Sequence, residues 1–195
     1  EVELATLSRV GEALATLHTQ PGNGLRARTA QDEARALDAA AGGVAAVCPS
    51  LGGIAHRLAR HLAGRLAGTP VAGATIHGDF SADQVVRDGD RVAIIDLDNL
   101  AWGDPLLDLG TFVAQLARNS LGDARLAARL EEIIDALVAG YAPLRPDPRL
   151  EWLNLYVAMG LLRLAPHAFR NRRAAWPSET ESVLDLAADY ASRCP

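Results

Sequence analysis

The stretch IHGDFSADQVVRDGDRVAIIDLDNLAWGDPLLDLG, residues 76–110, decides the predicted fold. Two β-like runs within it, 84–87 and 91–95, are separated by DGD at 88–90, which is typical of a tight hairpin turn. The polar triplet HGD at 77–79, called the HGD segment below, precedes them. The stretch therefore predicts a small β-hairpin with polar loops beside it.

Helical patterns flank this stretch on both sides. Apolar residues recur at steps of three and four, which predicts amphipathic helices. The expected helices are 2–19, a second from the cap Thr29 toward Gly42-Gly43 and Pro49, a third from Ser50 to Leu66, and then 105–118, 122–141, 147–165 and 178–192. Another short β-like run lies at 75–76, and there is no internal repeat or long linker. We expect a single α+β domain that is mainly α.

The composition excludes several classes of protein. No apolar run approaches the roughly 18 residues that span a bilayer, so we expect no membrane partner. The net charge of −5 provides no basic surface for a phosphate backbone, so we expect no nucleic-acid partner. Neither cysteine belongs to a metal or disulfide motif, and the first residues lack the features of an export signal. A cytoplasmic location is therefore expected.

Two carboxylates in this stretch need an explanation. Asp79 ends the HGD segment, and Asp96 directly follows the apolar run 92–95. A carboxylate next to a buried strand is costly to desolvate unless it is paired or binds a metal. A salt bridge or a helix cap would satisfy either residue, so burial alone does not distinguish a structural from a functional role.

The spacing of these residues favours a functional role. Gln84 follows Asp79 by five positions, and Asp96 follows Gln84 by twelve. Protein kinases carry H-x-D-x-x-x-x-N followed by D-F-G, in which the first Asp meets the substrate hydroxyl while the Asn and the second Asp hold Mg²⁺. The order and spacing therefore indicate phosphoryl-transfer chemistry.

The motifs HGDFSADQVV (77–86) and IIDLDNLAWGDPLLDLG (94–110) resemble those of the aminoglycoside phosphotransferase and choline kinase-like family. Its members commonly show HGDxxxxN, then an IDF segment followed by GDPxxDL. Residues 16–18 also resemble the LxxLH end of that family's first C-lobe helix. The resemblance follows the helix order of the whole chain, although only about 76–110 carries specific motifs. It implies the C-terminal lobe of a protein-kinase-like fold, whose small β-hairpin carries the catalytic and metal-binding loops.

This resemblance implies the main catalytic roles. Asp79 would orient the hydroxyl that attacks the γ-phosphate, and Asp96 and Gln84 would hold Mg²⁺ against the phosphates of ATP or GTP. Gln84 replaces the usual Asn but keeps an amide oxygen, and similar maltokinases and glucosamine kinases also carry Gln here. Leu97 replaces the usual Phe or Trp. Neither departure removes a group that the chemistry needs.

The resemblance implies supporting roles for four other residues. His77 would orient the loop backbone. Asp108 and Asp104 would brace the catalytic loop from the start of the following helix, where the helix dipole favours carboxylates. Asp98 would either touch a second metal ion or face solvent.

All nineteen basic residues are arginine, so the chain contains no lysine. The resembling family holds the α- and β-phosphates with a strand lysine under a glycine-rich loop, and neither precedes the HGD segment here. We therefore expect residues 1–195 to form the C-terminal lobe alone. Their partner would be an N-terminal nucleotide-binding lobe that these residues do not contain, and the fragment alone would be inactive.

The expected reaction transfers the γ-phosphate of ATP or GTP to a hydroxyl of an aminoglycoside, an aminosugar or a similar small molecule, which would include a role in antibiotic resistance. The candidate acceptor contacts are Asp83, Trp102, Glu151 and Asn154. The alternative is a non-catalytic kinase-like module for binding or regulation, which the replacement at Gln84 leaves open. The Arg-rich segment 167–176 is expected to be a solvated loop or helix end, or otherwise an anion contact.

Overall fold

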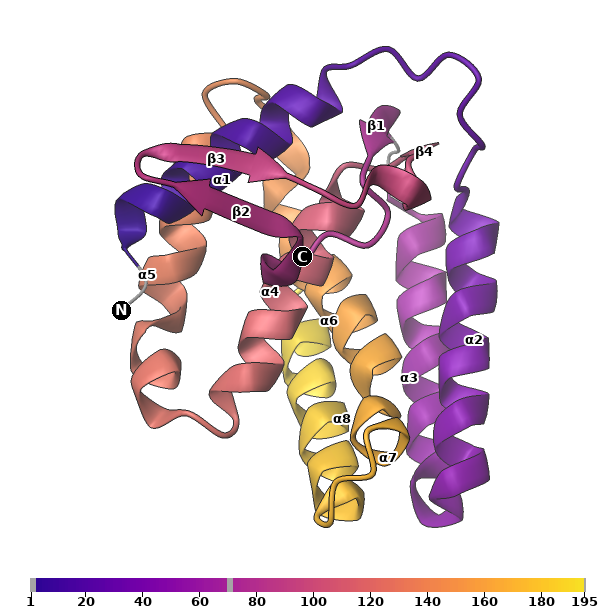
Figure 1. Cartoon of the computed structure of the whole chain (residues 1–195). Helices are drawn as coiled ribbons and strands as arrows, with labels where there is room; N and C mark the ends of the chain where they lie inside the picture. Colours follow the sequence, from indigo (N-terminus) through magenta and orange to yellow (C-terminus); the bar gives the residue numbers. More distant parts are fainter. Residues whose placement is uncertain (1–2, 70–71, 195) are drawn as a thin grey trace.

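The computed structural model describes residues 3–69 and 72–194, most of which are helical (Figure 1). The helices are α1 (Leu4–His18), α2 (Ala30–Val47), α3 (Pro49–Ala67), α4 (Leu106–Ser120), α5 (Ala124–Tyr141), α6 (Leu153–Leu164), α7 (His167–Arg170) and α8 (Trp176–Ser192). Every helix expected from the sequence is present. The expected helix 147–165 is divided into a 3₁₀ turn, η3 (Pro148–Trp152), followed by α6. The sequence does not predict α7, because a single turn is too short to show a period.

The strands form two small antiparallel pairs. The predicted hairpin is present as β2 (Val85–Asp88) and β3 (Arg91–Ile94), with Gly89 at φ 58° in the turn between them. The second pair consists of β1 (Ala74–Ile76) and β4 (Ala101–Gly103). The sequence does not predict β4, which is only three residues long. Because β1 pairs with β4, the two ends of the chain segment between them lie side by side. This segment contains the HGD segment and the β2–β3 hairpin.

The helices pack closely enough that glycine is required at one crossing. On α1, a Cβ at Gly11 would lie 2.1 Å from the carbonyl oxygen of Leu137 on α5. On α5, a Cβ at Gly140 would lie 1.8 Å from the carbonyl oxygen of Ser8. The two backbones are therefore in contact, and α5 supports the helix over which the β2–β3 hairpin lies (Figure 1).

Local sequence signals explain where several helices begin. Thr29 caps α2 as predicted, and its hydroxyl and the Asp32 carboxylate form a reciprocal capping box. Helix α2 runs through Gly42 and Gly43 and ends at Val47, shortly before Pro49, within the predicted bounds. Helix α3 begins at Pro49, one residue before the expected Ser50. Buried side chains from α1 to α6 and α8 join in one apolar core. In the part of the chain that the structure describes, no helix is long and apolar enough to cross a membrane.

Candidate active site

Asp108, in the first turn of α4, holds the backbone of the HGD segment. Its Oδ2 accepts a hydrogen bond from the backbone N–H of His77 at 2.6 Å, and its Oδ1 accepts one from the backbone N–H of Gly78 at 2.9 Å. Only 1% of Asp108 is exposed, so water does not compete for these bonds. Two charge-assisted hydrogen bonds to adjacent N–H groups fix the direction in which the loop leaves β1.

The same carboxylate binds His18 at the end of α1. His18 Nε2 lies 3.0 Å from Asp108 Oδ2, and His18 Nδ1 lies 2.8 Å from the hydroxyl of Tyr141 on α5. Because an ionised carboxylate only accepts, Nε2 carries a proton, and in the neutral ring Nδ1 accepts from the Tyr141 O–H. Burial raises the pKa of Tyr141, so this hydroxyl keeps its proton. This chain of bonds connects α1 and α5 to the loop.

The His77 side chain connects the HGD segment to the loop that carries Asp96. Its Nε2 donates to the carbonyl oxygen of Ile95 at 2.9 Å. The backbone N–H of Ile95 in turn donates to the carbonyl oxygen of Gln84 at 2.9 Å. Gln84 and Asp96 therefore lie at the same end of the β2–β3 hairpin, next to the loop that ends in Asp79.

Two residues of this region have a left-handed backbone. Gly78 has φ 87°, and a Cβ there would lie 2.4 Å from the carbonyl oxygen of Asn99. Only glycine therefore allows the HGD segment and the loop after Asp96 to approach so closely. Asp96 has φ 61° and ψ 60°, a conformation that is unfavourable for a residue with a side chain. Such residues are concentrated at active sites and ligand clamps.

A buried ion network supports the other side of the HGD segment. Arg28 donates from Nη1 to the carbonyl oxygen of Gly78 at 2.6 Å and from Nε to Glu33 at 2.5 Å. Glu33 lies on α2, is 2% exposed and also pairs with Arg163 of α6. Burial lowers the pKa of Arg163, against the opposing effect of the Glu33 charge. These three residues could not be identified from the sequence, because no local pattern distinguishes them from surface charges.

Asp79 is exposed at the end of this supported loop. Within the described residues its side chain makes no hydrogen bond or ion pair, although its charge acts on the imidazole of His167 in α7. Burial lowers the pKa of His167, and the charges of Arg170 and Arg118 lower it further, while Asp79 opposes them. Asp79 therefore follows a backbone that is fixed at His77 and Gly78, and its own side chain is open to a ligand.

Gln84 and Asp96 supply an amide and a carboxylate oxygen at one end of the hairpin. Neither side chain makes a hydrogen bond or ion pair with residues 3–69 and 72–194. Among these residues, no group of three or more His, Cys, Asp or Glu is arranged to hold a metal ion. Mg²⁺ is usually bound by one or two protein ligands together with substrate phosphates and water, so this sparse pair of hard oxygen donors fits it.

Asp104 does not brace the HGD segment as the resemblance implies. Its carboxylate accepts hydrogen bonds from Arg149 Nη1 at 2.6 Å, from the Tyr156 hydroxyl at 2.9 Å and from the backbone N–H of Leu106 at 3.0 Å. Burial raises the pKa of Tyr156, and the neighbouring Asp104 charge adds to this effect. Asp104 therefore binds the first N–H group of α4 and connects this helix to η3 through Arg149 and to α6 through Tyr156. Its role in the structure is separate from that of Asp108.

Three candidate acceptor contacts lie outside this arrangement. The ring of Trp102 packs against Gly22 and Gly73, where an added Cβ would lie 1.9 Å and 2.6 Å from ring atoms. Glu151 lies on η3 and Asn154 in the first turn of α6. Across the described ranges, no hydrogen bond or ion pair joins either residue to the HGD segment.

Asp83 and Asp98 lie on the turns that follow the two predicted catalytic residues. Asp83 belongs to the 3₁₀ turn η1 (Ala82–Gln84) after Asp79, and Asp98 belongs to the 3₁₀ turn η2 (Leu97–Asn99) after Asp96. Both carboxylates are exposed. Of the predicted substrate contacts, Asp83 is the one that the chain brings beside Asp79.

Comparisons with known proteins match the chain to a family model and to solved structures. A family model described as the phosphotransferase enzyme family matches residues 2–149. A comparison with curated proteins found no match. Solved structures do match, and the three described next share 13–21% identity with the chain, which relates the folds alone.

Three of these structures illustrate the match. A choline/ethanolamine kinase family protein from Mesorhizobium loti has a TM-score of 0.68 at 17% identity, over 97% of this chain and 65% of its own. A glucosamine kinase in complex with glucosamine, ADP and inorganic phosphate has a TM-score of 0.69 at 21% identity, over 97% and 56%. A spectinomycin phosphotransferase in complex with ADP and spectinomycin has a TM-score of 0.61 at 13% identity, over 98% and 66%. The chain thus spans less than two thirds of each structure.

Proposed function

Because the chain belongs to the phosphotransferase enzyme family and has the mainly helical C-terminal lobe of a protein-kinase-like fold, we propose that it is the catalytic lobe of a small-molecule O-kinase. The reaction transfers the γ-phosphate of ATP or GTP to a hydroxyl of an aminoglycoside, an aminosugar or a similar molecule. The observation that carries this proposal is that Asp108 binds the backbone N–H groups of His77 and Gly78. These bonds fix the HGD segment, while the Asp79 carboxylate remains exposed.

In this proposal, Asp79 accepts a hydrogen bond from the acceptor hydroxyl and directs its oxygen toward the γ-phosphorus. Phosphoryl transfer has a loose transition state, so positioning contributes more than strong base catalysis. Asp108, His77 and Arg28 act through the backbone of the loop and keep Asp79 in place. Asp83, one turn further along the chain, would contact the acceptor.

Asp96 and Gln84 would hold Mg²⁺ together with the phosphates of the donor. A bound divalent cation at this point neutralises charge that moves to the leaving oxygen. The exposed Asp96 carboxylate and the Gln84 amide are the side chains at this end of the hairpin with oxygen atoms of the right kind. Asp98 would contribute to a second cation or face solvent.

We also propose that catalysis requires a nucleotide-binding lobe outside these residues. The chain contains no lysine to contact the α- and β-phosphates, and it spans 53–65% of the length of the first three matching structures. The 195 residues alone would therefore bind nucleotide weakly. The observation that favours a non-catalytic module instead is Gln84, whose longer side chain replaces the usual Asn.

An acceptor screen tests the proposed activity. The polypeptide that contains this chain and its nucleotide-binding segment is incubated with Mg²⁺ and either ATP or GTP, together with aminoglycosides, aminosugars, maltose or choline. We expect nucleotide consumption that depends on both Mg²⁺ and one acceptor class, with the phosphate recovered on a hydroxyl. Nucleotide bound without turnover for any acceptor would support the non-catalytic module.

A further inference from the structure

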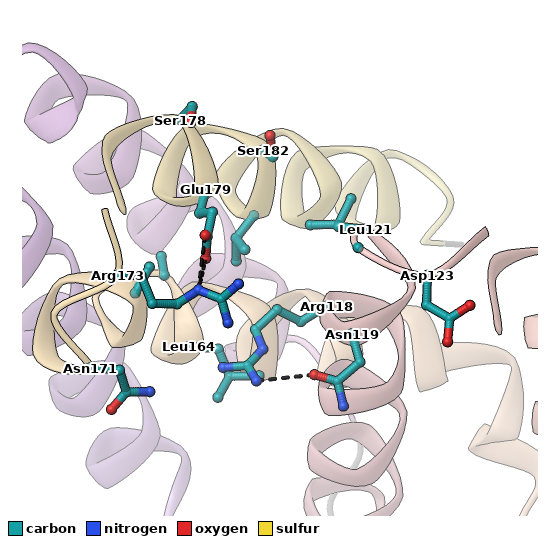
Figure 2. A pocket seen from close by; sticks show the side chains of 14 residues that line it. Arg118, Asn119, Leu121, Asp123, Leu164, Asn171, Arg173, Ser178, Glu179 and Ser182 are labelled. Atoms are coloured by element: carbon teal, nitrogen blue, oxygen red, sulfur yellow. Dashed lines mark hydrogen bonds and ion pairs between the residues drawn. The ribbon is translucent and has the colours of Figure 1, made fainter. Parts of the chain in front are cut away.

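A pocket of about 440 Å³ lies between the end of α4 and the segment that connects α6 to α8 (Figure 2). Arg118 lines it from α4, roughly 15 Å along the helix from Asp108, which anchors the HGD segment. No residue of the HGD segment lines the pocket, and its volume is that of a small-molecule site. We propose that it binds a phosphate or carboxylate group carried by a small organic molecule, a function beyond the proposed phosphotransfer.

Two arginines and two acids line this pocket, and within the described residues one of the arginines, Arg118, has no carboxylate bonded to it. Arg173 is paired, with its Nε 2.9 Å from Glu179 Oε1. Arg118 donates to the amide oxygen of Asn119 at 3.0 Å, and within the described residues no carboxylate pairs with it. The remaining acid of the lining, Asp123, caps α5 by accepting hydrogen bonds from the backbone N–H groups of Arg125 and Leu126. Figure 2 shows the two guanidinium groups in the space between α4 and α8.

The segment that forms one wall is itself basic, and its arginine in the pocket lining is Arg173. Residues 167–176 contain three arginines and no acidic residue. Arg172 has φ 53°, a left-handed conformation that bends the chain between Asn171 and Arg173, both of which line the pocket. An anion contact is the alternative that the sequence leaves open for this segment. The pocket provides the cavity that such a contact requires.

The uncharged part of the lining indicates what carries the anion. Leu164, Ala165 and Val183 provide an apolar wall, while Ser178 and Ser182 provide hydroxyl groups. A free inorganic ion would gain nothing from the apolar wall, whereas a carbon skeleton would be buried against it. Guanidinium groups match the two oxygens of a carboxylate or phosphate. The lining therefore fits a small organic oxyanion.

Calorimetric titration tests this proposal with defined probes. The protein is titrated with inorganic phosphate, glucose 6-phosphate, gluconate and glucose. We expect the two organic anions to bind, inorganic phosphate to bind more weakly, and glucose not to bind. Arg118→Gln should weaken anion binding about tenfold or more, because it removes a charge-assisted contact. Arg60→Gln, on the exposed face of α3, removes the same charge elsewhere and should leave binding unchanged.

A second variant should bind the anions more tightly. Glu179→Gln removes the counter-ion of Arg173, so it should tighten binding of the same anions severalfold, which loss of folding could not produce. Equal binding of inorganic phosphate and glucose 6-phosphate would overturn the assignment to an organic ligand. Unchanged affinity in Arg118→Gln, or no binding of either organic anion at millimolar concentration, would overturn the site itself.

Discussion

Asp108 connects more of the candidate site than any other residue described here. One buried carboxylate binds two backbone N–H groups of the HGD segment and the imidazole of His18. The sequence predicts its position, because the resemblance covers GDPLLDL. It does not predict that Tyr141 completes the chain of bonds, because this contact joins residues that are 123 positions apart. The carboxylate therefore has a structural task on which the proposed chemistry depends.

Replacing this carboxylate should destabilise the fold. Asp108→Ala leaves two buried N–H groups and a buried imidazole without their acceptor, which we expect to cost about 3–5 kcal/mol of unfolding free energy. Urea denaturation measures this cost. Asp135→Ala, on the exposed face of α5, is the matched control and should change stability by less than about 0.5 kcal/mol. Equal stabilities for the two variants would show that the buried hydrogen bonds contribute little.

The helices and strands agree with the sequence prediction where the apolar period is long or a turn signal is present. The hairpin and the long helices are confirmed, because apolar spacing and the DGD turn specify them locally. The short elements β4 and α7 could not be predicted, because tertiary contacts rather than local sequence form them. The same reason explains Asp104: its partners Arg149 and Tyr156 lie 45 and 52 positions away.

The close crossing of α1 and α5 should not tolerate a larger residue at Gly140. Gly140→Ala places a Cβ 1.8 Å from the Ser8 carbonyl oxygen, so the helices must separate. We expect a loss of about 1–3 kcal/mol, the usual cost of overpacking. Gly64→Ala, on α3, places its Cβ in open space and should stabilise by about 0.4–1 kcal/mol. Thermal unfolding of both variants checks the pair, and a stabilised Gly140→Ala would contradict the observed crossing.

The HGD segment lies where several helices and the hairpin meet. Helix α1, helix α4 and the hairpin all contact the HGD segment or the residues bonded to it, and the Arg28–Glu33–Arg163 network connects α2 and α6 to the same loop. The sequence predicts the catalytic segment and the fold class from motifs. It does not predict this network, which depends on packing between distant helices. The rigidity that phosphoryl transfer needs is therefore a property of the assembled lobe.

A single-turnover measurement of phosphate transfer tests most directly whether Asp79 is the catalytic residue. Transfer of labelled γ-phosphate to the acceptor found in the screen is followed for the full polypeptide, for Asp79→Asn and for the control Asp135→Asn. We expect Asp79→Asn to lower the transfer rate about 10²- to 10⁴-fold and to leave nucleotide affinity nearly unchanged, whereas the control transfers normally. Transfer by Asp79→Asn at the rate of the unaltered protein would contradict the assignment of the HGD segment as the catalytic centre.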